Sequence, residues 1–150
     1  MPLTLTSPAF IHNGQIPPKY SCKGENISPP LEISGIPEGT LSLALIVDDP
    51  DAPAGDWVHW LLWNIPQVAK IEENTTPKAA VAGVNSFFKT DYGGPCPPSG
   101  THRYFFKLFA LDTVLDLDNE AEKADLKKAM EGHVLESTEL VGLFSKEEAQ

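Results

Sequence analysis

The sequence predicts a mainly β protein, an antiparallel β-sandwich with one or two short peripheral helices. Several apolar runs have the length of strands, and loops rich in glycine and proline separate them; the chain contains 11 Gly and 14 Pro. The one helical pattern lies late in the chain, so strands and helices do not alternate. Strands followed by a helix favour an antiparallel sheet over a parallel α/β arrangement.

The predicted strands begin after an extended, proline-rich segment. Residues 16–35, IPPKYSCKGENISPPLEISG, contain two Pro-Pro pairs and lead into a strand near Leu31–Ile33. The run LSLALIVDD, residues 41–49, is apolar on both faces, which is typical of a strand that is covered on both sides. The strand HWLLWNIP follows at residues 59–66. The linker between the two, residues 48–58, is longer than most hairpin loops, and such loops often carry function.

The second half of the chain adds further strands and the predicted helix. A short strand near Ala80–Asn85, the aromatic run RYFFKLFALD and a closing strand ELVGLF complete the sheets. The helix is predicted within residues 116–133, with Asp118 or Asn119 as N-cap, acidic residues in its first turn and lysines later. Its apolar side chains are expected to form one buried stripe: Ala121, Leu126, Ala129, Met130 and Val134.

Length and charge limit the function classes. A chain of 150 residues suits a single domain, residues 1–150, with a substantial core. The formal net charge is −10 and Lys and Arg do not cluster, which argues against nucleic acid as a partner. No apolar run approaches the ~20 residues that span a bilayer, and the N-terminus lacks the features of a signal peptide. We therefore expect a cytoplasmic protein without integral membrane association.

The two cysteines are expected to be reduced thiols. Cytoplasmic proteins rarely keep disulfides, and two cysteines are too few to define a disulfide framework. Cys22 and Cys96 both lie in proline-rich loops. If those loops meet, a disulfide or a redox-sensitive contact is the alternative.

The residues that could carry chemistry stand next to predicted strand ends. Asp49 and Asp51 follow one strand, His59 begins the next, and His102 precedes a third. Tyr104 lies two residues after His102 and shares a strand face with it. If these strands are neighbours, carboxylates and imidazoles converge at one end of a sheet. Each residue alone has a simpler explanation, since Asp often caps a turn and His often packs at a strand end.

Two loop motifs make the sequence similar to a known family. The stretch DPDAP with His59 after it, together with YGGPCPPSGTHRY, resembles the phosphatidylethanolamine-binding protein family in its bacterial and archaeal, Raf-kinase-inhibitor-like branch. The stretches GENISPPL and GHVLESTELVG fit the same branch, so the resemblance covers essentially the whole chain. It implies a β-sandwich with a small anion-binding pocket at one end. Family members bind phosphate-bearing head groups, nucleotides or small anions, and some inhibit kinases or serine proteases.

The resemblance also implies which residues form the pocket. The ligand-binding set would be Asp49, His59, His102 and Tyr104 with backbone from Gly94 to Pro98, among them Gly94, Cys96 and Pro97. The rim would be Asp51, Ala52, Pro53 and Trp57. The bond Ala52–Pro53 is a candidate for the cis peptide that the family commonly has in this motif. Animal members carry a pocket Tyr roughly where this sequence has Ala54, and a C-terminal helix beside the pocket, which we expect to be missing here because the sequence ends soon after ELVGLF. Both departures predict a more open pocket. Exposed aromatic rims and the missing helix leave a homodimer as an open alternative.

The residue types suit a phosphate group. Two imidazolium rings, a tyrosine hydroxyl and backbone N–H groups of the glycine loop would supply a compact set of donors. An ionised Asp49 facing the anion would oppose binding by about 4 kcal/mol at 4 Å and an effective dielectric constant of 20. We therefore expect Asp49 to orient a histidine by accepting a hydrogen bond from its ring.

The predicted function is a non-catalytic binding module, without a cofactor, for phosphate-bearing ligands such as a phospholipid head group or a nucleotide. It would regulate a kinase or protease through protein contact. Enzyme motifs such as G-x-S-x-G, the phosphate-binding loop and H-E-x-x-H are absent. Three alternatives stay open. They are an acid–base hydrolase with Cys96 as the only thiol candidate, a zinc site of Asp49, Asp51, His59 and His102, and an inhibitor that acts through a surface loop alone.

Overall fold

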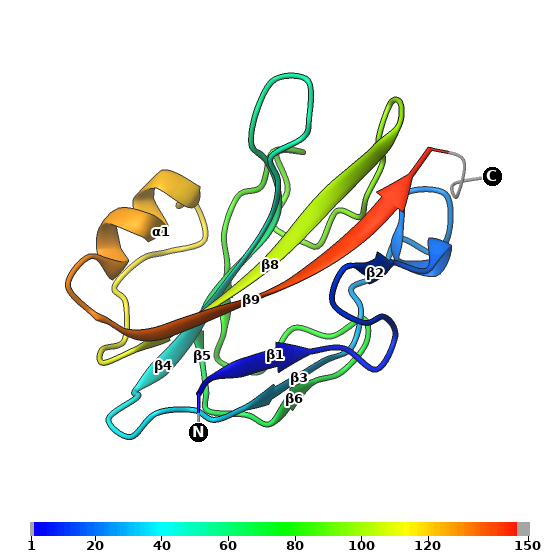
Figure 1. Cartoon of the computed structure of the whole chain (residues 1–150). Helices are drawn as coiled ribbons and strands as arrows, with labels where there is room; N and C mark the ends of the chain where they lie inside the picture. The colour runs from blue at the N-terminus through cyan, green and yellow to red at the C-terminus, as the bar shows by residue number, and fades with distance from the viewer. Residues whose placement is uncertain (1, 147–150) are drawn as a thin grey trace.

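Two β-sheets form the structure, a computed structural model that describes residues 2–146 (Figure 1). The larger sheet has the strand order β2-β9-β8-β4-β5-β7 and the smaller sheet the order β1-β3-β6. The smaller sheet comprises β1 (Thr4–Thr6), β3 (Leu31–Ser34) and β6 (Lys70–Ile71). The larger sheet comprises β2 (Gly14–Gln15), β4 (Ser42–Asp49), β5 (Trp57–Ile65), β7 (Val81–Ala82), β8 (Thr101–Leu111) and β9 (Val134–Ser145).

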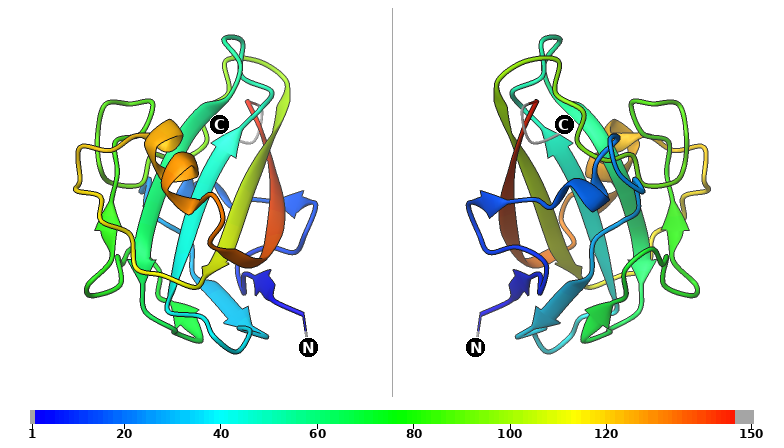
Figure 2. Two further views of the ribbon diagram at one scale, coloured as in Figure 1. Left: turned by 90° about the vertical axis from the view of Figure 1, so that its left-hand side faces the viewer. Right: turned by 90° about the vertical axis from the view of Figure 1, so that its right-hand side faces the viewer.

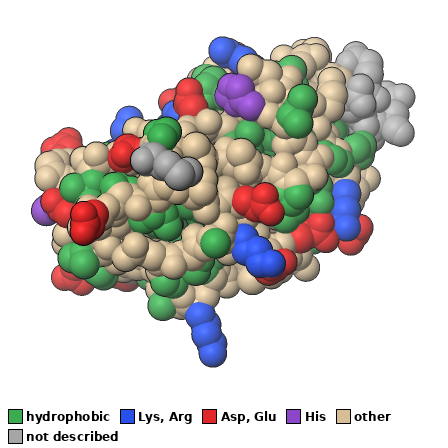
Figure 3. Space-filling view, turned by 60° about the horizontal axis from the view of Figure 1, so that its bottom comes forward, with side chains coloured by type: hydrophobic (Ala, Val, Ile, Leu, Met, Phe, Trp, Pro, Cys, Tyr) green, Lys and Arg blue, Asp and Glu red, His purple; other side chains and the backbone are tan. Residues whose placement is uncertain are grey.

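The predicted mainly β fold is confirmed, and the strand pairs are antiparallel with one exception in the described part of the chain. β2 runs parallel to β9 at Gly14 and Gln15. The two helical segments are the 3-10 helix η1 (Pro18–Tyr20) and the α-helix α1 (Lys123–Met130). No helix within residues 2–146 is long and apolar enough to cross a membrane. Acidic, basic and hydrophobic side chains mix on the face shown in Figure 3.

The core lies on both faces of the larger sheet. Leu43, Leu45 and Val47 of β4 pack toward the smaller sheet, where they join one buried cluster with Leu5 and Ile33. The alternate residues Ala44 and Ile46 join a second buried cluster under α1. Figure 2 shows α1 on the side of the larger sheet that faces away from the smaller one. All eight residues of β4 are therefore buried, as the apolar pattern on both faces predicted.

Leu41, the first residue of that predicted strand, is instead exposed and precedes β4. The strand starts one residue later because Thr40 ends a turn in which its amide donates to the Pro37 carbonyl.

The helix starts later than the sequence predicted. Its N-cap is Glu122, whose N–H donates to the Asp125 carboxylate at 2.9 Å. Asp118 caps a separate turn before the helix, accepting from the Glu120 N–H at 3.0 Å, so both proposed N-caps were wrong. Ala121, Leu126 and Met130 are buried as predicted. Val134 is exposed and begins β9, because the helix ends at Met130 and cannot continue the stripe.

An ion pair fixes α1 to the sheet. The Lys123 ammonium lies 2.6 Å from the buried Asp48 carboxylate and 3.3 Å from Asp56. Lys107 of β8 is the second partner of Asp48, at 3.2 Å. Burying a carboxylate is unfavourable unless cations accompany it, so the two lysines explain how Asp48 is tolerated inside the sheet.

Two expectations about the chain itself were wrong. Cys22 and Cys96 form a disulfide, with Cα atoms 5.5 Å apart, because the two proline-rich loops do meet. The inference from a cytoplasmic location to reduced thiols therefore fails. The described chain contains no cis peptide bond, so Ala52–Pro53 is trans. The loop adopts its turn without it, with the Gly55 amide donating to the Ala52 carbonyl at 2.9 Å.

Candidate functional site

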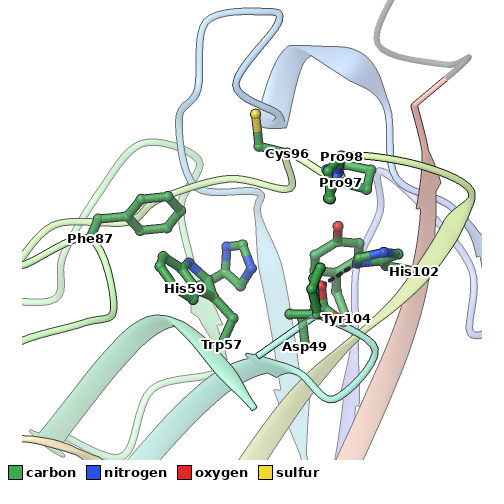
Figure 4. Close-up of a pocket in the computed structure, with 11 residues that line it drawn as sticks. Asp49, Trp57, His59, Phe87, Cys96, Pro97, Pro98, His102 and Tyr104 are labelled. Carbon is green, nitrogen blue, oxygen red and sulfur yellow. Dashed lines mark hydrogen bonds and ion pairs between the residues drawn. The ribbon is translucent and has the colours of Figure 1, made fainter. Parts of the chain in front are cut away.

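A cavity of about 300 Å³ opens at one end of the larger sheet, between the loop 50–56 and the loop 93–100 (Figure 4). Its lining residues are Asp49, Ala52, Pro53, Trp57, His59, Phe87, Cys96, Pro97, Pro98, His102 and Tyr104. Most residues of the predicted pocket thus come together. We refer to this space below as the anion cavity, after the class of ligand that we propose for it below.

Strand register brings these residues to one place. β4 ends at Asp49, which lies opposite Trp57 at the start of β5. β8 pairs with the other side of β4 and starts at Thr101, so His102 reaches the same end of the sheet. β4 continues through Asp49 and β5 begins at Trp57, so the linker comprises residues 50–56 and is shorter than the predicted 48–58.

Asp49 holds the ring of His102. The Nδ1 of His102 lies 2.6 Å from Oδ2 of Asp49, and both side chains are buried. The other carboxylate oxygen, Oδ1, accepts the backbone N–H of Asp51 at 2.8 Å. A carboxylate that accepts from Nδ1 fixes the tautomer of the ring and leaves Nε2 as its other polar atom. This is the geometry of an orienting carboxylate.

His59 is fixed by the backbone instead. Its Nδ1 lies 2.6 Å from the Gly93 carbonyl oxygen and must donate, because a carbonyl only accepts. Burial lowers the pKa of His59, despite the opposing effect of the Gly93 hydrogen bond and of nearby carboxylates. The ring is therefore neutral near pH 7, and its Nε2 carries a lone pair.

Tyr104 lies between the two imidazoles. Its ring centroid is 5.2 Å from that of His59 and 6.4 Å from that of His102. Its side chain is 1% exposed, and the hydroxyl has no hydrogen-bond partner within residues 2–146. Burial raises the pKa of Tyr104, so the hydroxyl keeps its proton. Figure 4 shows this hydroxyl directed toward Pro97 and Pro98, across the cavity.

Asp51, predicted as part of the rim, does not line the cavity. Its carboxylate accepts from Nε and from a terminal nitrogen of Arg103, both at 2.9 Å, and from the Arg103 backbone N–H at 2.9 Å. The guanidinium lowers the pKa of Asp51 to about 2. The two aspartates of DPDAP therefore differ in role, because Asp51 ties the loop to β8 while Asp49 faces the cavity.

The glycine loop supplies fewer backbone donors than the sequence suggested. Gly94 lies outside the cavity lining, and its N–H donates to Asn26 Oδ1 at 2.8 Å. A side chain at Gly94 would come within 2.2 Å of the Tyr20 carbonyl oxygen, so close packing explains this glycine. Of the four residues Pro95–Pro98, Cys96 alone has an N–H. Pro97 and Pro98 give the wall apolar surface in place of donors.

Phe87 is the lining residue that sequence reasoning missed. Its ring meets Trp57 and His59 edge-on, with centroids 5.5 and 5.4 Å apart. Asn85 fixes this segment, because its side-chain oxygen accepts the N–H groups of Phe87 and Lys89. An Asn before two aromatic residues was the available signal for such a turn.

Within residues 2–146, no three His, Cys, Asp or Glu side chains are grouped so that they could hold a metal ion. Of the four residues of the zinc alternative, Asp51 is bound by Arg103 and does not line the cavity. Cys96 is part of the disulfide, so in this form of the protein it is no thiol nucleophile.

Comparisons with known proteins agree with this architecture. A family model described as phosphatidylethanolamine-binding protein matches residues 6–145. A UPF0098 protein of Methanothermobacter thermautotrophicus is 51% identical over 150 residues, covering 96% of this chain and 99% of the relative.

Solved structures of similar proteins share the fold. A phosphatidylethanolamine-binding protein homologue from Chlamydia trachomatis superposes with a TM-score of 0.93 at 42% identity, covering 97% of this chain and 98% of its own. E. coli YbcL, described as a member of the mammalian family, gives a TM-score of 0.90 at 32% identity, covering 97% and 99%.

Proposed function

Because the chain belongs to the phosphatidylethanolamine-binding protein family, we propose that it is a non-catalytic binding protein whose cavity holds the phosphate of a phosphate-bearing ligand. One observation carries the proposal. The buried Tyr104 hydroxyl has no partner in the described chain and lies between two imidazoles whose Nδ1 atoms are already fixed. A buried hydroxyl without a partner is unfavourable, so a ligand oxygen in its reach would be stabilising.

The tautomers define which ligand fits. Tyr104 donates, and His102 in its protonated form donates through Nε2 while Asp49 balances the charge. Neutral His59 offers a lone pair at Nε2, which suits an acidic P–OH. The set therefore suits a phosphate monoanion, which retains one proton, or a dianion that binds while His59 takes up a proton from water. The second pKa of a phosphate ester is about 6, so both forms are available near neutral pH.

The walls determine what surrounds the phosphate. Trp57, Phe87, Pro53 and the two prolines of the loop enclose the donors with apolar surface. Excluding water strengthens the hydrogen bonds to the phosphate. The aromatic edges of Trp57 and Phe87 also offer contact area to the organic part of an ester, such as a lipid head group or a nucleoside.

Calorimetric titration with inorganic phosphate tests the proposal, with sulfate as the second probe. Sulfate is a dianion without an O–H at neutral pH, so it cannot donate to His59. We expect phosphate to bind more tightly than sulfate, and His59→Gln to reduce this difference. Tyr104→Phe and His102→Gln should weaken phosphate binding about tenfold or more, in line with the loss of a charged hydrogen bond. His133→Ala, which removes an imidazole outside the cavity, is the control. No phosphate binding by the unaltered protein would refute the proposal.

The same variants separate the remaining alternatives. An acid–base hydrolase would release alcohol from a phosphate monoester at a rate that falls in His59→Gln and His102→Gln. A kinase or protease inhibitor acting through a surface loop would keep its inhibition in both variants.

A further inference from the structure

We propose that the Cys22–Cys96 disulfide is a thiol–disulfide exchange site that controls the wall of the anion cavity, with a dithiol as its reaction partner. Its test by phosphate affinity rests on the proposed function, whereas its test by amide hydrogen exchange of the backbone does not. In the oxidised form the wall is held in place and the anion binds. In the reduced form the wall is released and the affinity falls.

The disulfide stands between two cavities. Cys96 lines the anion cavity and also a second cavity of about 360 Å³, which Cys22 lines as well. Phe87 is shared by the two cavities in the same way. The disulfide and the Phe87 ring therefore form the partition between them. In Figure 4 the sulfur of Cys96 points away from the imidazoles, toward the segment that carries Cys22.

Hydrogen bonds hold the loop on one side of Cys96 only. Before it, the Tyr92 hydroxyl donates to the Tyr20 carbonyl, the Gly94 N–H donates to Asn26, and the Cys22 N–H donates to the Pro95 carbonyl. Within residues 2–146, the disulfide is the only covalent bond or hydrogen bond that joins residues 96–99 to another segment. The next fixed point is the Gly100 carbonyl, which accepts from the Lys146 N–H at 3.1 Å.

Breaking the disulfide therefore frees the part of the loop that walls the cavity. Pro97 and Pro98 lie directly after Cys96 and face the imidazoles. When they move, the partition opens and water reaches the donors. The electrostatic attraction for an anion weakens as the local dielectric constant rises.

The disulfide is accessible to a reductant. Cys96 is exposed and Cys22 is half-buried. A thiolate of the dithiol attacks one sulfur of the disulfide, most directly that of Cys96, and forms a mixed disulfide with it. Cys22 then leaves as a thiolate. The second thiol of the dithiol then closes its own disulfide and releases Cys96. Two electrons and two protons pass from the dithiol to the protein, leaving two cysteine thiols and one oxidised dithiol.

A disulfide that merely stabilises the whole fold is the competing explanation, and amide hydrogen exchange distinguishes the two. The protein is compared in three forms at 25 °C: oxidised, reduced with dithiothreitol, and as the double variant Cys22→Ser/Cys96→Ser. We expect exchange at the Cys22 and Lys146 amides, which donate to the Pro95 and Gly100 carbonyls, to rise tenfold or more on reduction and to stay independent of added urea, as local opening requires. Exchange at the amides of β4 should instead follow the free energy of unfolding. Unchanged exchange at the Cys22 and Lys146 amides would overturn the inference, and so would a rise there that depends on urea as steeply as exchange in β4 does.

Titration with inorganic phosphate gives the second readout. We expect affinity to fall about tenfold on reduction, which corresponds to 1.4 kcal/mol, and to return on reoxidation. The double variant should behave like the reduced protein and should not respond to dithiothreitol. Equal affinity of the oxidised and reduced forms would overturn the inference. If the oxidised protein binds no phosphate, the proposed function fails, and hydrogen exchange alone decides whether the disulfide holds the wall.

Discussion

The ring nitrogen Nδ1 of His102 lies 2.6 Å from Oδ2 of Asp49, although 53 residues separate the two in sequence. The contact joins the end of β4 to the start of β8 and is buried from solvent. A buried carboxylate next to the proposed phosphate site would have two opposing effects. It would orient the imidazole ring of His102, and it would repel the anion.

The substitution Asp49→Asn separates orientation of the ring from repulsion of the anion, because it keeps the shape of the side chain and removes its charge. If orientation dominates, phosphate affinity falls about tenfold, since a hydrogen bond to a charged group contributes about 1.5–3 kcal/mol. Calorimetric titration measures the change. Asp56→Asn, which removes an exposed carboxylate outside the anion cavity, should leave the affinity nearly unchanged. Tighter binding in Asp49→Asn would show that repulsion dominates.

Tyr104→Phe should change stability and binding in opposite directions. The hydroxyl is buried without a partner in the described chain, so removing it should leave the free protein as stable or up to about 1 kcal/mol more stable. Phosphate affinity should fall at the same time. Urea unfolding and calorimetric titration measure the two quantities.

Tyr20→Phe is the matched control for that experiment. The Tyr20 hydroxyl donates to Glu73 at 2.5 Å and lies outside the anion cavity. Its loss should destabilise the protein slightly and leave phosphate affinity intact. A destabilised Tyr104→Phe would mean that its hydroxyl has a partner in the unliganded protein.

The pH dependence of stability should report on His59. Burial lowers the pKa of His59 below its ordinary value of 6.5, so the unfolded chain binds a proton that the folded protein does not. The stability that this residue contributes is present above about pH 6.5 and is lost as the pH falls through the lower folded-state pKa. The melting temperature measured from pH 7.5 to 5 should fall less steeply in His59→Gln than in the unaltered protein. Saturating phosphate should reduce the slope as well, because an anion favours protonated His59. Equal slopes in the variant and the unaltered protein would contradict a depressed pKa.

The Asp51–Arg103 pair should stabilise the loop that carries the rim. Arg103 lowers the pKa of Asp51 from 3.8 to about 2, so the contribution is complete above about pH 4 and is lost as the pH falls through 2. The Arg103 side chain is half exposed, so we expect a coupling energy of about 1 kcal/mol at pH 7. A double-mutant cycle of Asp51→Asn and Arg103→Gln, measured by urea unfolding, gives this energy. Additive single effects would show that the bidentate contact contributes nothing.

Reducing the disulfide should lower the free energy of unfolding. Cys22 and Cys96 are 74 residues apart, and closing a loop of that size in the unfolded chain corresponds to on the order of 4 kcal/mol in the chain-entropy model. Since domains are commonly stable by about 5–15 kcal/mol, the reduced protein should still fold at 25 °C. Urea unfolding with and without dithiothreitol measures the loss. The reductant should have no effect on Cys22→Ser/Cys96→Ser, and a response there would point to a cause other than the disulfide.

The sequence predicted a strand most clearly where both faces of the segment are buried. The alternation of leucines with Ala44 and Ile46 specified a strand covered on both faces, and β4 is that strand. The family resemblance carried by the loop motifs DPDAP and YGGPCPPSGTHRY indicated most residues that line the cavity. The strand signal is local, because it depends on the chemical type and spacing of neighbouring residues, whereas the cavity residues came from the resemblance.

The contacts between segments were decided by the tertiary structure alone. Asp49 and Asp51 are the same residue type two positions apart, yet one meets an imidazole and the other a guanidinium, because the chain turns between them. Phe87 lies at the cavity because the Asn85 side chain accepts its N–H and holds the turn. Cys22 forms a disulfide with Cys96, which lies 74 residues further along the chain. Such pairings depend on the distances and directions of side chains brought together by folding. Residue type and spacing along the chain do not contain that information.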